Sequence, residues 1–294
     1  STHRWGKRVV LRMVDGGRAT PSLAHLGFSP MIEGKLQELL QKPQGLIIVS
    51  GPVGSGKTTT LYSCLQEVHE SKSGTSTIVT LEDPIEVQLP FASQTQVDRK
   101  RGLDFAAALR SILRQDPNVL MLGEIRDAET AAIATQAGLT GHMILTTLHV
   151  DSAIGTFARL SDMGVKDFVL SGAVIGCLSQ RLVRSLCTSC RQEAPVDAHL
   201  RQRFESLGVP LEQNVCYQPK GCEFCEGTGY TGRLILSEIF EVNPKVAAAL
   251  SRGASTAELQ QLSVEQGMKP LILTGLERAA RGETSLEEVL RVCG

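Results

Sequence analysis

The sequence predicts an α/β protein in which helices cover both faces of a parallel sheet. Short apolar runs typical of buried parallel strands recur at residues 46–49, 78–81, 119–122 and 143–147. Helical segments lie between these runs, and this alternation predicts that the strands run parallel. Polar residues at the carboxyl ends of the strands should then meet at one edge of the sheet.

Length and composition are those of a globular protein with two domains, or with one large domain and an appendage. The chain has 294 residues, of which 42% are hydrophobic and 4% aromatic, and its net charge is −1. The weak charge argues against binding nucleic acid by bulk electrostatics, and no apolar run approaches the ~20 residues of a membrane span. The polar start shows neither a signal peptide nor a Met, so we expect a piece of a cytosolic protein.

The elements before the first buried strand are an isolated strand and a helix. Residues 8–14 predict a strand followed by a turn at 15–17, which we expect to be the edge of a further domain because one strand cannot fold alone. Ser29 and Pro30 have the residue types preferred at the N-cap and the first position of a helix. Asp104 predicts the N-cap of a later amphipathic helix.

The segment 51–58 fills every fixed position of the phosphate-binding loop G-x-x-x-x-G-K-[ST]. It follows a buried strand and precedes a helix, which places it at a helix N-terminus where anions are favoured. Lys57 can reach the β- and γ-phosphates, and Thr58 offers a hydroxyl to Mg²⁺. A chance glycine-rich turn is the alternative, but it would not explain the order strand, loop, helix. We therefore expect ATP to be bound by Gly51, Gly54, Ser55, Gly56, Lys57, Thr58 and Thr59.

Acidic residues and histidines follow or flank the later strands. Glu124 follows the run 119–122 after a single glycine, where a second nucleotide motif places one carboxylate near the Mg²⁺–water shell. The segment 82–86 offers further acids to orient or deprotonate an attacking water. His142 and His149 bracket the fourth strand, and we expect both at the functional edge of the sheet, although a single histidine is more often a packing residue.

Four cysteines form two C-x-x-C pairs, a spacing that places four thiolates around one tetrahedral Zn²⁺. A redox pair would need a thioredoxin-like βαβ setting, which neither pair has, and the similar zinc module of Hsp40 chaperones uses several copies where this chain has one. The linker between the pairs accommodates an inserted helix, and after the second pair the pattern turns helical, at 256–265 and 285–290. The sequence thus predicts a structural zinc site formed by Cys187, Cys190, Cys222 and Cys225.

Taken together, these segments resemble the secretion ATPases, the hexameric motors of type II secretion and type IV pilus assembly. Residues 80–86, 114–127 and 140–149 resemble the family's aspartate box, Walker B and histidine box, in the family's order after the phosphate loop. Residues 180–233 resemble its tetracysteine region, so the resemblance covers almost the whole chain. Most of the family's N-terminal domain, with a second arginine, has no counterpart here.

The resemblance implies roles for individual residues. Glu86 would be the catalytic base, Glu124 would coordinate Mg²⁺ through water, and His149 would sense the γ-phosphate. Arg12 matches an arginine that reaches the nucleotide phosphates. The residues themselves leave open whether Glu82 or Glu86 is the base.

The resemblance also implies an organisation and a function. We expect a remnant of an N-terminal domain and linker (1–28), a RecA-like P-loop ATPase core (29–180), a tetracysteine zinc-binding subdomain (181–232) and a C-terminal helical subdomain (233–294). The implied function is ATP hydrolysis that drives pseudopilus or pilus assembly at the cytoplasmic face of the inner membrane. The implied partners are further copies in a hexameric ring and the inner-membrane platform proteins, and no nucleic acid.

Other functions would each require different features in the sequence. Four cysteines favour the assembly motors, because retraction motors lack them, and residues 152–155 and 159–164 look more like type II secretion than pilus assembly. A RecA-like DNA motor needs a basic channel or stacking aromatics, which one Trp and three Tyr do not favour. A zinc-ribbon interaction module that merely kept a nucleotide fold would leave the acids unused.

Overall fold

The computed structural model describes residues 2–3, 6–7, 20–98 and 103–294. The predicted strand at 8–14, with Arg12 in it, lies outside the described residues. Near the start, β1 (Thr2–His3) pairs antiparallel with β2 (Gly6–Lys7).

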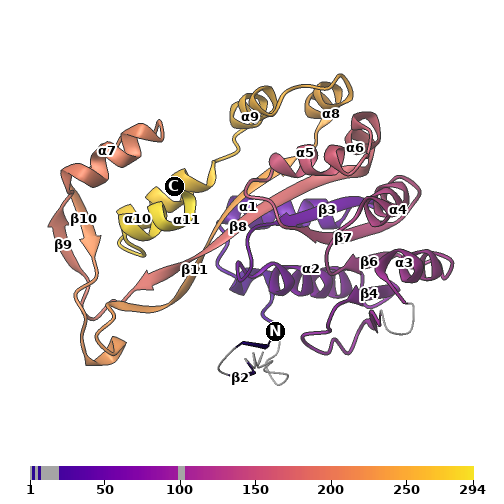
Figure 1. Cartoon of the computed structure of the whole chain (residues 1–294), viewed down its shortest axis with the longest axis horizontal. Coiled ribbons are helices and arrows are strands. Elements are labelled where there is room, and N and C mark those ends of the chain that lie inside the picture. Colours follow the sequence, from indigo (N-terminus) through magenta and orange to yellow (C-terminus); the bar gives the residue numbers. More distant parts are fainter. Residues whose placement is uncertain (1, 4–5, 8–19, 99–102) are drawn as a thin grey trace.

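A seven-stranded sheet in the order β11-β8-β3-β7-β6-β4-β5 forms the centre of the molecule (Figure 1). Its strands are β3 (Gly45–Ser50), β4 (Ile78–Glu82), β5 (Ser93–Gln96), β6 (Val119–Leu122), β7 (Met143–Leu148), β8 (Val174–Leu186) and β11 (Tyr230–Glu241). Neighbouring strands are parallel except for the antiparallel pair β8–β11. The predicted α/β fold with its largely parallel sheet is confirmed.

Both faces of the sheet are buried, because alternate strand residues enter two separate cores. In β3, Leu46 and Ile48 belong to one core, whereas Ile47 and Val49 belong to the other. The first core includes side chains of α3 (Phe105–Leu113), α4 (Ala128–Leu139), α5 (Gly155–Asp162), α6 (Asp167–Ala173), α8 (Pro244–Ser251) and α9 (Thr256–Glu265). The second includes side chains of the 3₁₀ turn η1 (Leu23–His25), α1 (Pro30–Leu40) and α2 (Lys57–Ser71).

Side-chain caps fix where the helices begin. Ser29 accepts a hydrogen bond from the backbone N–H of Ile32, and Pro30 is the first residue of α1. Asp104 accepts one from Ala107 at the start of α3. Both caps agree with the sequence prediction.

A smaller lobe lies beyond one end of the sheet, and β8 and β11 extend toward it (Figure 1). The lobe contains β9 (Gln192–Pro195), α7 (Ala198–Ser206), β10 (Val215–Gln218) and the 3₁₀ turn η3 (Glu223–Cys225), and it packs against α10 (Leu271–Ala280) and α11 (Leu286–Cys293). The helix expected between the cysteine pairs is α7. The sequence predicts helices after Cys225, but β11 comes before them. The proposed boundary between residues 232 and 233 falls inside this strand.

Among the described residues, no helix combines the length and the apolar character that crossing a bilayer requires.

Candidate nucleotide-binding active site

The phosphate-binding loop connects β3 to α2, as the sequence predicts. Gly51 follows the last residue of β3, and a Cβ on it would lie 2.5 Å from the backbone oxygen of Gln180, so only glycine fits this close approach. Gly56 is the N-cap of α2 and has a φ of +88°, a left-handed conformation that glycine adopts without strain. The loop therefore ends where the first backbone N–H groups of a long helix point outward.

Lys57 and Ser55 carry polar groups suited to phosphate oxygens. The Lys57 Nζ donates to the carbonyl oxygens of Gly51 (2.8 Å) and Pro52 (3.0 Å), and it lies 3.5 Å from Nδ1 of His149. Burial lowers the pKa of Lys57, while the charge of Glu124 opposes this shift. The hydroxyl of Ser55 is buried and has no hydrogen-bond partner among the described residues. A phosphate group would satisfy this hydroxyl and the ammonium together, so the loop fits a nucleotide.

The loop forms one wall of a cavity of about 470 Å³, and the ends of β4, β6 and β7 form the other. The cavity brings the loop residues from Gly54 to Thr59 together with Glu82, Glu86, Glu124 and His149. Gly51 lies behind the loop and is not part of the cavity wall. Residues far apart in the sequence thus converge at the carboxyl edge of the sheet.

Glu124 and His149 are neighbours in this cavity. The Nε2 of His149 lies 3.5 Å from a carboxylate oxygen of Glu124, so the histidine stands between that carboxylate and Lys57. Arg126 pairs with Glu124 and, at 3.5 Å, with Asp83. Burial alone would raise the pKa of Glu124, but the hydrogen bond and charge of Arg126, with His149 and Lys57, lower it. Glu124 is therefore an anion suited to a cation–water shell.

The two acids of the aspartate box have different surroundings. Glu82 is only 2% exposed and receives hydrogen bonds from Thr80 (2.7 Å), from Gln94 (3.0 Å) and from Tyr62. These donors take up most of the acceptor positions of its carboxylate. Glu86 is half-buried, and its backbone N–H donates to the hydroxyl of Tyr62 at 3.3 Å.

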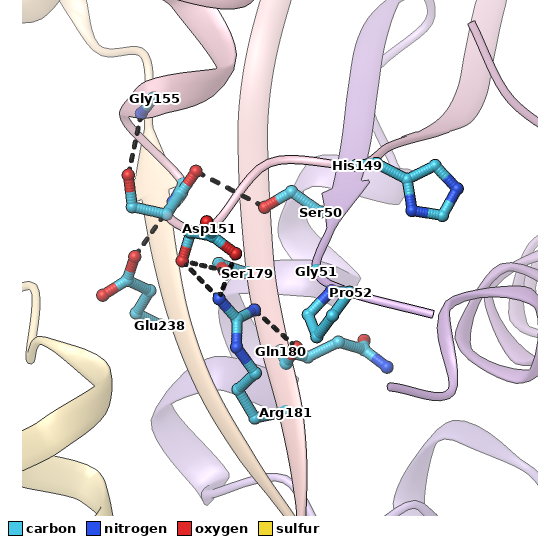
Figure 2. A network of polar contacts seen from close by, with 12 residues as sticks. Ser50, Gly51, Pro52, His149, Asp151, Gly155, Ser179, Gln180, Arg181 and Glu238 are labelled. Carbon is cyan, nitrogen blue, oxygen red and sulfur yellow. Dashed lines mark hydrogen bonds and ion pairs between the residues drawn. The ribbon is translucent and has the colours of Figure 1, made fainter. Parts of the chain in front are cut away.

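Strand β8 supports both the phosphate loop and the segment after His149, which the sequence did not reveal. The amide of Gln180 donates to the carbonyl of Ser55 (2.7 Å) and accepts from the hydroxyl of Thr60 (2.9 Å). Its neighbour Arg181 donates to the backbone (2.7 Å) and the carboxylate (3.1 Å) of Asp151, two residues after His149 (Figure 2).

A buried carboxylate extends this network toward the small lobe. Glu238 on β11 (Figure 2) accepts the backbone N–H of Ala153 (2.9 Å) and that of Leu271 (3.0 Å), the first residue of α10. Burial raises the pKa of Glu238, although these two N–H groups oppose the shift. The carboxylate therefore joins the loop after β7 to the start of α10.

The prediction that His142 lies at the functional edge is wrong. His142 precedes β7 and His149 follows it, so the two histidines lie at opposite ends of a six-residue strand. The Nε2 of His142 lies 3.9 Å from a carboxylate oxygen of Asp116, and neither ring nitrogen of His142 has a hydrogen-bond partner among the described residues. His142 is thus a packing residue at the amino edge of the sheet.

The four cysteines of the two C-x-x-C pairs meet at the base of the small lobe. Their sulfur atoms all lie within 4.8 Å of one another. The separations are 3.9 Å for Cys187–Cys222, 3.8 Å for Cys190–Cys225 and 3.7 Å for Cys222–Cys225. Four thiolates bound to one tetrahedral Zn²⁺ at ~2.3 Å would be ~3.8 Å apart. The cluster therefore has the dimensions of a closed four-thiolate metal site.

Backbone N–H groups prepare one of these sulfurs to be a thiolate. The Sγ of Cys225 accepts from the N–H groups of Cys222 (3.2 Å) and Gly229 (3.1 Å). Burial opposes ionisation, but these two hydrogen bonds, together with those from the thiols of Cys222 and Cys190, lower the pKa of Cys225 to about 6. Since the thiolate is the form that binds metal, this arrangement favours coordination.

Comparison with known proteins places this geometry in context. The profile of the family described as "Type II/IV secretion system protein" matches residues 2–291. The type II secretion system protein E of Klebsiella pneumoniae is 45% identical over 290 residues, covering 98% of this chain and 56% of that protein. The type IV pilus assembly ATPase PilB of Thermus thermophilus is 42% identical over 286 residues, covering 97% of this chain and 32% of that protein.

A solved structure shows the same fold. The pilus retraction motor PilT with bound ADP superposes with a TM-score of 0.69 and 27% identity, over 93% of this chain and 67% of that chain. The chain spans little more than half the length of the secretion protein and about a third of the length of PilB that it matches.

Proposed function

Because this chain belongs to the type II/IV secretion system protein family, we propose that it is the motor part of an ATPase that drives assembly of a pseudopilus for type II secretion. The observation that carries the proposal is the cavity in which the phosphate loop meets Glu86, Glu124 and His149. Assembly of a type IV pilus is the second candidate, since relatives named for both processes match at similar identity, 45% and 42%.

The positions of the side chains in the cavity support a role for each of them. Lys57 and the N–H groups at the start of α2 hold the phosphates of ATP, replacing the contacts of Lys57 with its own loop. Glu124 would coordinate Mg²⁺ through water, and His149, next to both Glu124 and Lys57, would sense the γ-phosphate. Mg²⁺, when bound, neutralises charge that develops on the transferred phosphoryl group.

We propose that Glu86, rather than Glu82, is the base that takes a proton from the attacking water. Glu82 is almost fully buried, and its carboxylate already accepts from three side chains. Glu86 lines the same cavity and is more exposed, so it can accept a proton from water without breaking that network.

The tetracysteine cluster is proposed to hold one structural Zn²⁺ through Cys187, Cys190, Cys222 and Cys225. Four thiolates complete a tetrahedral shell and leave no position for a substrate water. The sulfur separations and the donors to Cys225 support this assignment.

The working protein is proposed to be a hexameric ring at the cytoplasmic face of the inner membrane, in contact with membrane platform proteins and not with nucleic acid. Arg12 is proposed to reach the nucleotide phosphates, and such a donor is typically worth ~10³-fold or more in rate.

ATP turnover under defined additions tests the proposal. We expect Mg²⁺-dependent hydrolysis by the chain that neither single-stranded nor duplex DNA stimulates. Strong stimulation by DNA would instead support a DNA motor, and no binding of ATP would contradict the nucleotide site. A rate per chain that rises with protein concentration would support the ring.

A further inference from the structure

Tyr62 connects the helix of the phosphate loop to the segment that carries Glu86. It lies in α2, whose first residue is Lys57, and is only 2% exposed. Its ring packs in the apolar core between α2 and the sheet, yet its hydroxyl reaches out of that core. There the hydroxyl contacts the carboxylate of Glu82 and the backbone N–H of Glu86 (3.3 Å).

The direction of both hydrogen bonds is fixed by chemistry. A backbone N–H can only donate, so the hydroxyl oxygen accepts from Glu86, and its single proton must go to Glu82. Burial and the hydrogen bond to Glu82 raise the pKa of Tyr62, which keeps that proton in place. Glu82 is held in turn by Thr80 (2.7 Å) and Gln94 (3.0 Å). By accepting the proton of Tyr62, Glu82 orients the lone pair of the Tyr62 oxygen that accepts a hydrogen bond from the N–H of Glu86.

Two further side chains hold the backbone around Glu86, but both come from the edge strand. Gln96 accepts the N–H of Ile85 (3.2 Å), and Gln94 accepts that of Leu89 (2.7 Å). Both glutamines belong to β5, whose residues are half-buried or exposed. Tyr62 is the anchor that comes from the helix beginning at the phosphate loop.

We propose that Tyr62 is a positioning residue for hydrolysis: its hydroxyl ties the backbone of Glu86 to the phosphate-loop helix and so sets the base relative to the phosphates. The inference rests on the proposed function of Glu86. A base displaced by a fraction of an ångström loses much of its effect on rate, whereas the contacts that bind nucleotide at Lys57 stay in place. If Tyr62 were needed only for packing, its substitution would not lower the rate of hydrolysis while leaving nucleotide binding intact.

The test removes the single oxygen atom. Tyr62→Phe keeps the ring in the core, and we expect kcat to fall about tenfold while KM and the Kd for ATP change less than twofold. Tyr217→Phe is the matched control, because its hydroxyl also donates to a glutamate, Glu193 (2.9 Å), but in the small lobe. Wild-type kcat in Tyr62→Phe, or a rise in Kd as large as the loss of kcat, would overturn the proposal.

A double variant separates positioning from general damage. If Tyr62 acts through Glu86, adding Tyr62→Phe to Glu86→Gln should leave the residual rate unchanged. An equal tenfold loss in that background would overturn the proposal, because the effect would then not pass through Glu86. Wild-type turnover by Glu86→Gln itself would instead reject the base assignment on which the inference depends, so the two failures are distinguishable.

Discussion

The phosphate loop packs against the middle of β8, whereas the four cysteines lie at its carboxyl end, and the two sites are assembled in different ways. The nucleotide cavity collects residues from five strands, β4, β6, β7, β8 and β11, and from α2 and α3. The cysteine cluster draws on two short segments, 187–190 and 222–225. The nucleotide cavity is built from distant parts of the sheet and remains open, with polar groups facing it. The cysteine cluster is local and closed. Substitutions should therefore change chemistry at the first and stability at the second.

The sharpest test of this difference is Glu86→Gln. The amide cannot take a proton from water, so we expect turnover to fall ~10³-fold with the affinity for ATP nearly unchanged. Glu38→Gln, on the exposed side of α1, is the control. Steady-state hydrolysis and equilibrium binding of ATP measure the two effects. Full activity would move the role of base to Glu82.

Lys57→Ala should act on binding instead. Removal of an ammonium that contacts phosphates already in the ground state should weaken the affinity for ATP ~10²-fold. Titration calorimetry gives the affinity, and thermal unfolding without nucleotide should show little change. A large loss of stability without nucleotide would mean that the contacts of Lys57 with Gly51 and Pro52 are structural.

Cys222→Ser should show the reverse pattern. Loss of one of four thiolates should release about one Zn²⁺ per chain, and the lobe should unfold roughly 5–10 °C earlier, with ATP affinity unchanged. Cys216→Ser, in the same lobe but outside the cluster, should keep its zinc. Metal analysis and calorimetry provide the readouts. Freshly purified protein without zinc would contradict the assignment.

The smallest effect concerns an ion pair between the two regions. Glu288 on α11 pairs with Arg184 of β8 (2.6 Å) and with Arg291 (2.7 Å). Burial opposes ionisation of Glu288, but the hydrogen bonds from Arg291 and Arg184 lower its pKa from 4.5 to about 2. Because the pKa of Glu288 is lower in the folded state than in the unfolded state, its ionisation stabilises the fold at pH values above the unfolded-state pKa. This contribution is lost as the pH falls toward 2.

We therefore expect Glu288→Gln to cost about 1–2 kcal/mol at pH 7, since the arginines are partly exposed to solvent. The difference from the wild type should shrink between pH 4.5 and pH 2. Urea unfolding at several pH values measures it, with the exposed neighbour Glu287→Gln as the control. A difference independent of pH would show that the ion pair is not its cause.

The sequence was informative wherever a signal is local. Apolar runs located β3, β4, β6 and β7, and the positions of Glu124 and His149 just beyond the carboxyl ends of strands predicted that they meet at one edge. The same reasoning placed His142 wrongly, because a residue before a parallel strand lies at the opposite edge from one after it.

Contacts between distant residues could not be predicted. Gln180 meets Ser55 across 125 positions, and nothing near either residue marks the pair. Arg126 and Tyr62 also remained unassigned, because their roles depend on which side chains the folded sheet places opposite them. The strands β8 and β11, which pair with each other across the tetracysteine insertion, were both missed.

The place of the cysteine cluster has a consequence for how this family can vary. Cys187 directly follows β8, and its N–H donates to Gly229 (2.9 Å), the residue before β11, where Leu186 pairs with Tyr230. The chain between the cysteine pairs thus leaves and returns at one fixed point. Pairing of the two long strands then depends little on how much chain is inserted, because loop-closure entropy grows only slowly with length. Residues 191–221 can therefore change in length without disturbing the pairing of β8 and β11, provided that their replacement still covers the apolar side chains of α10 and α11.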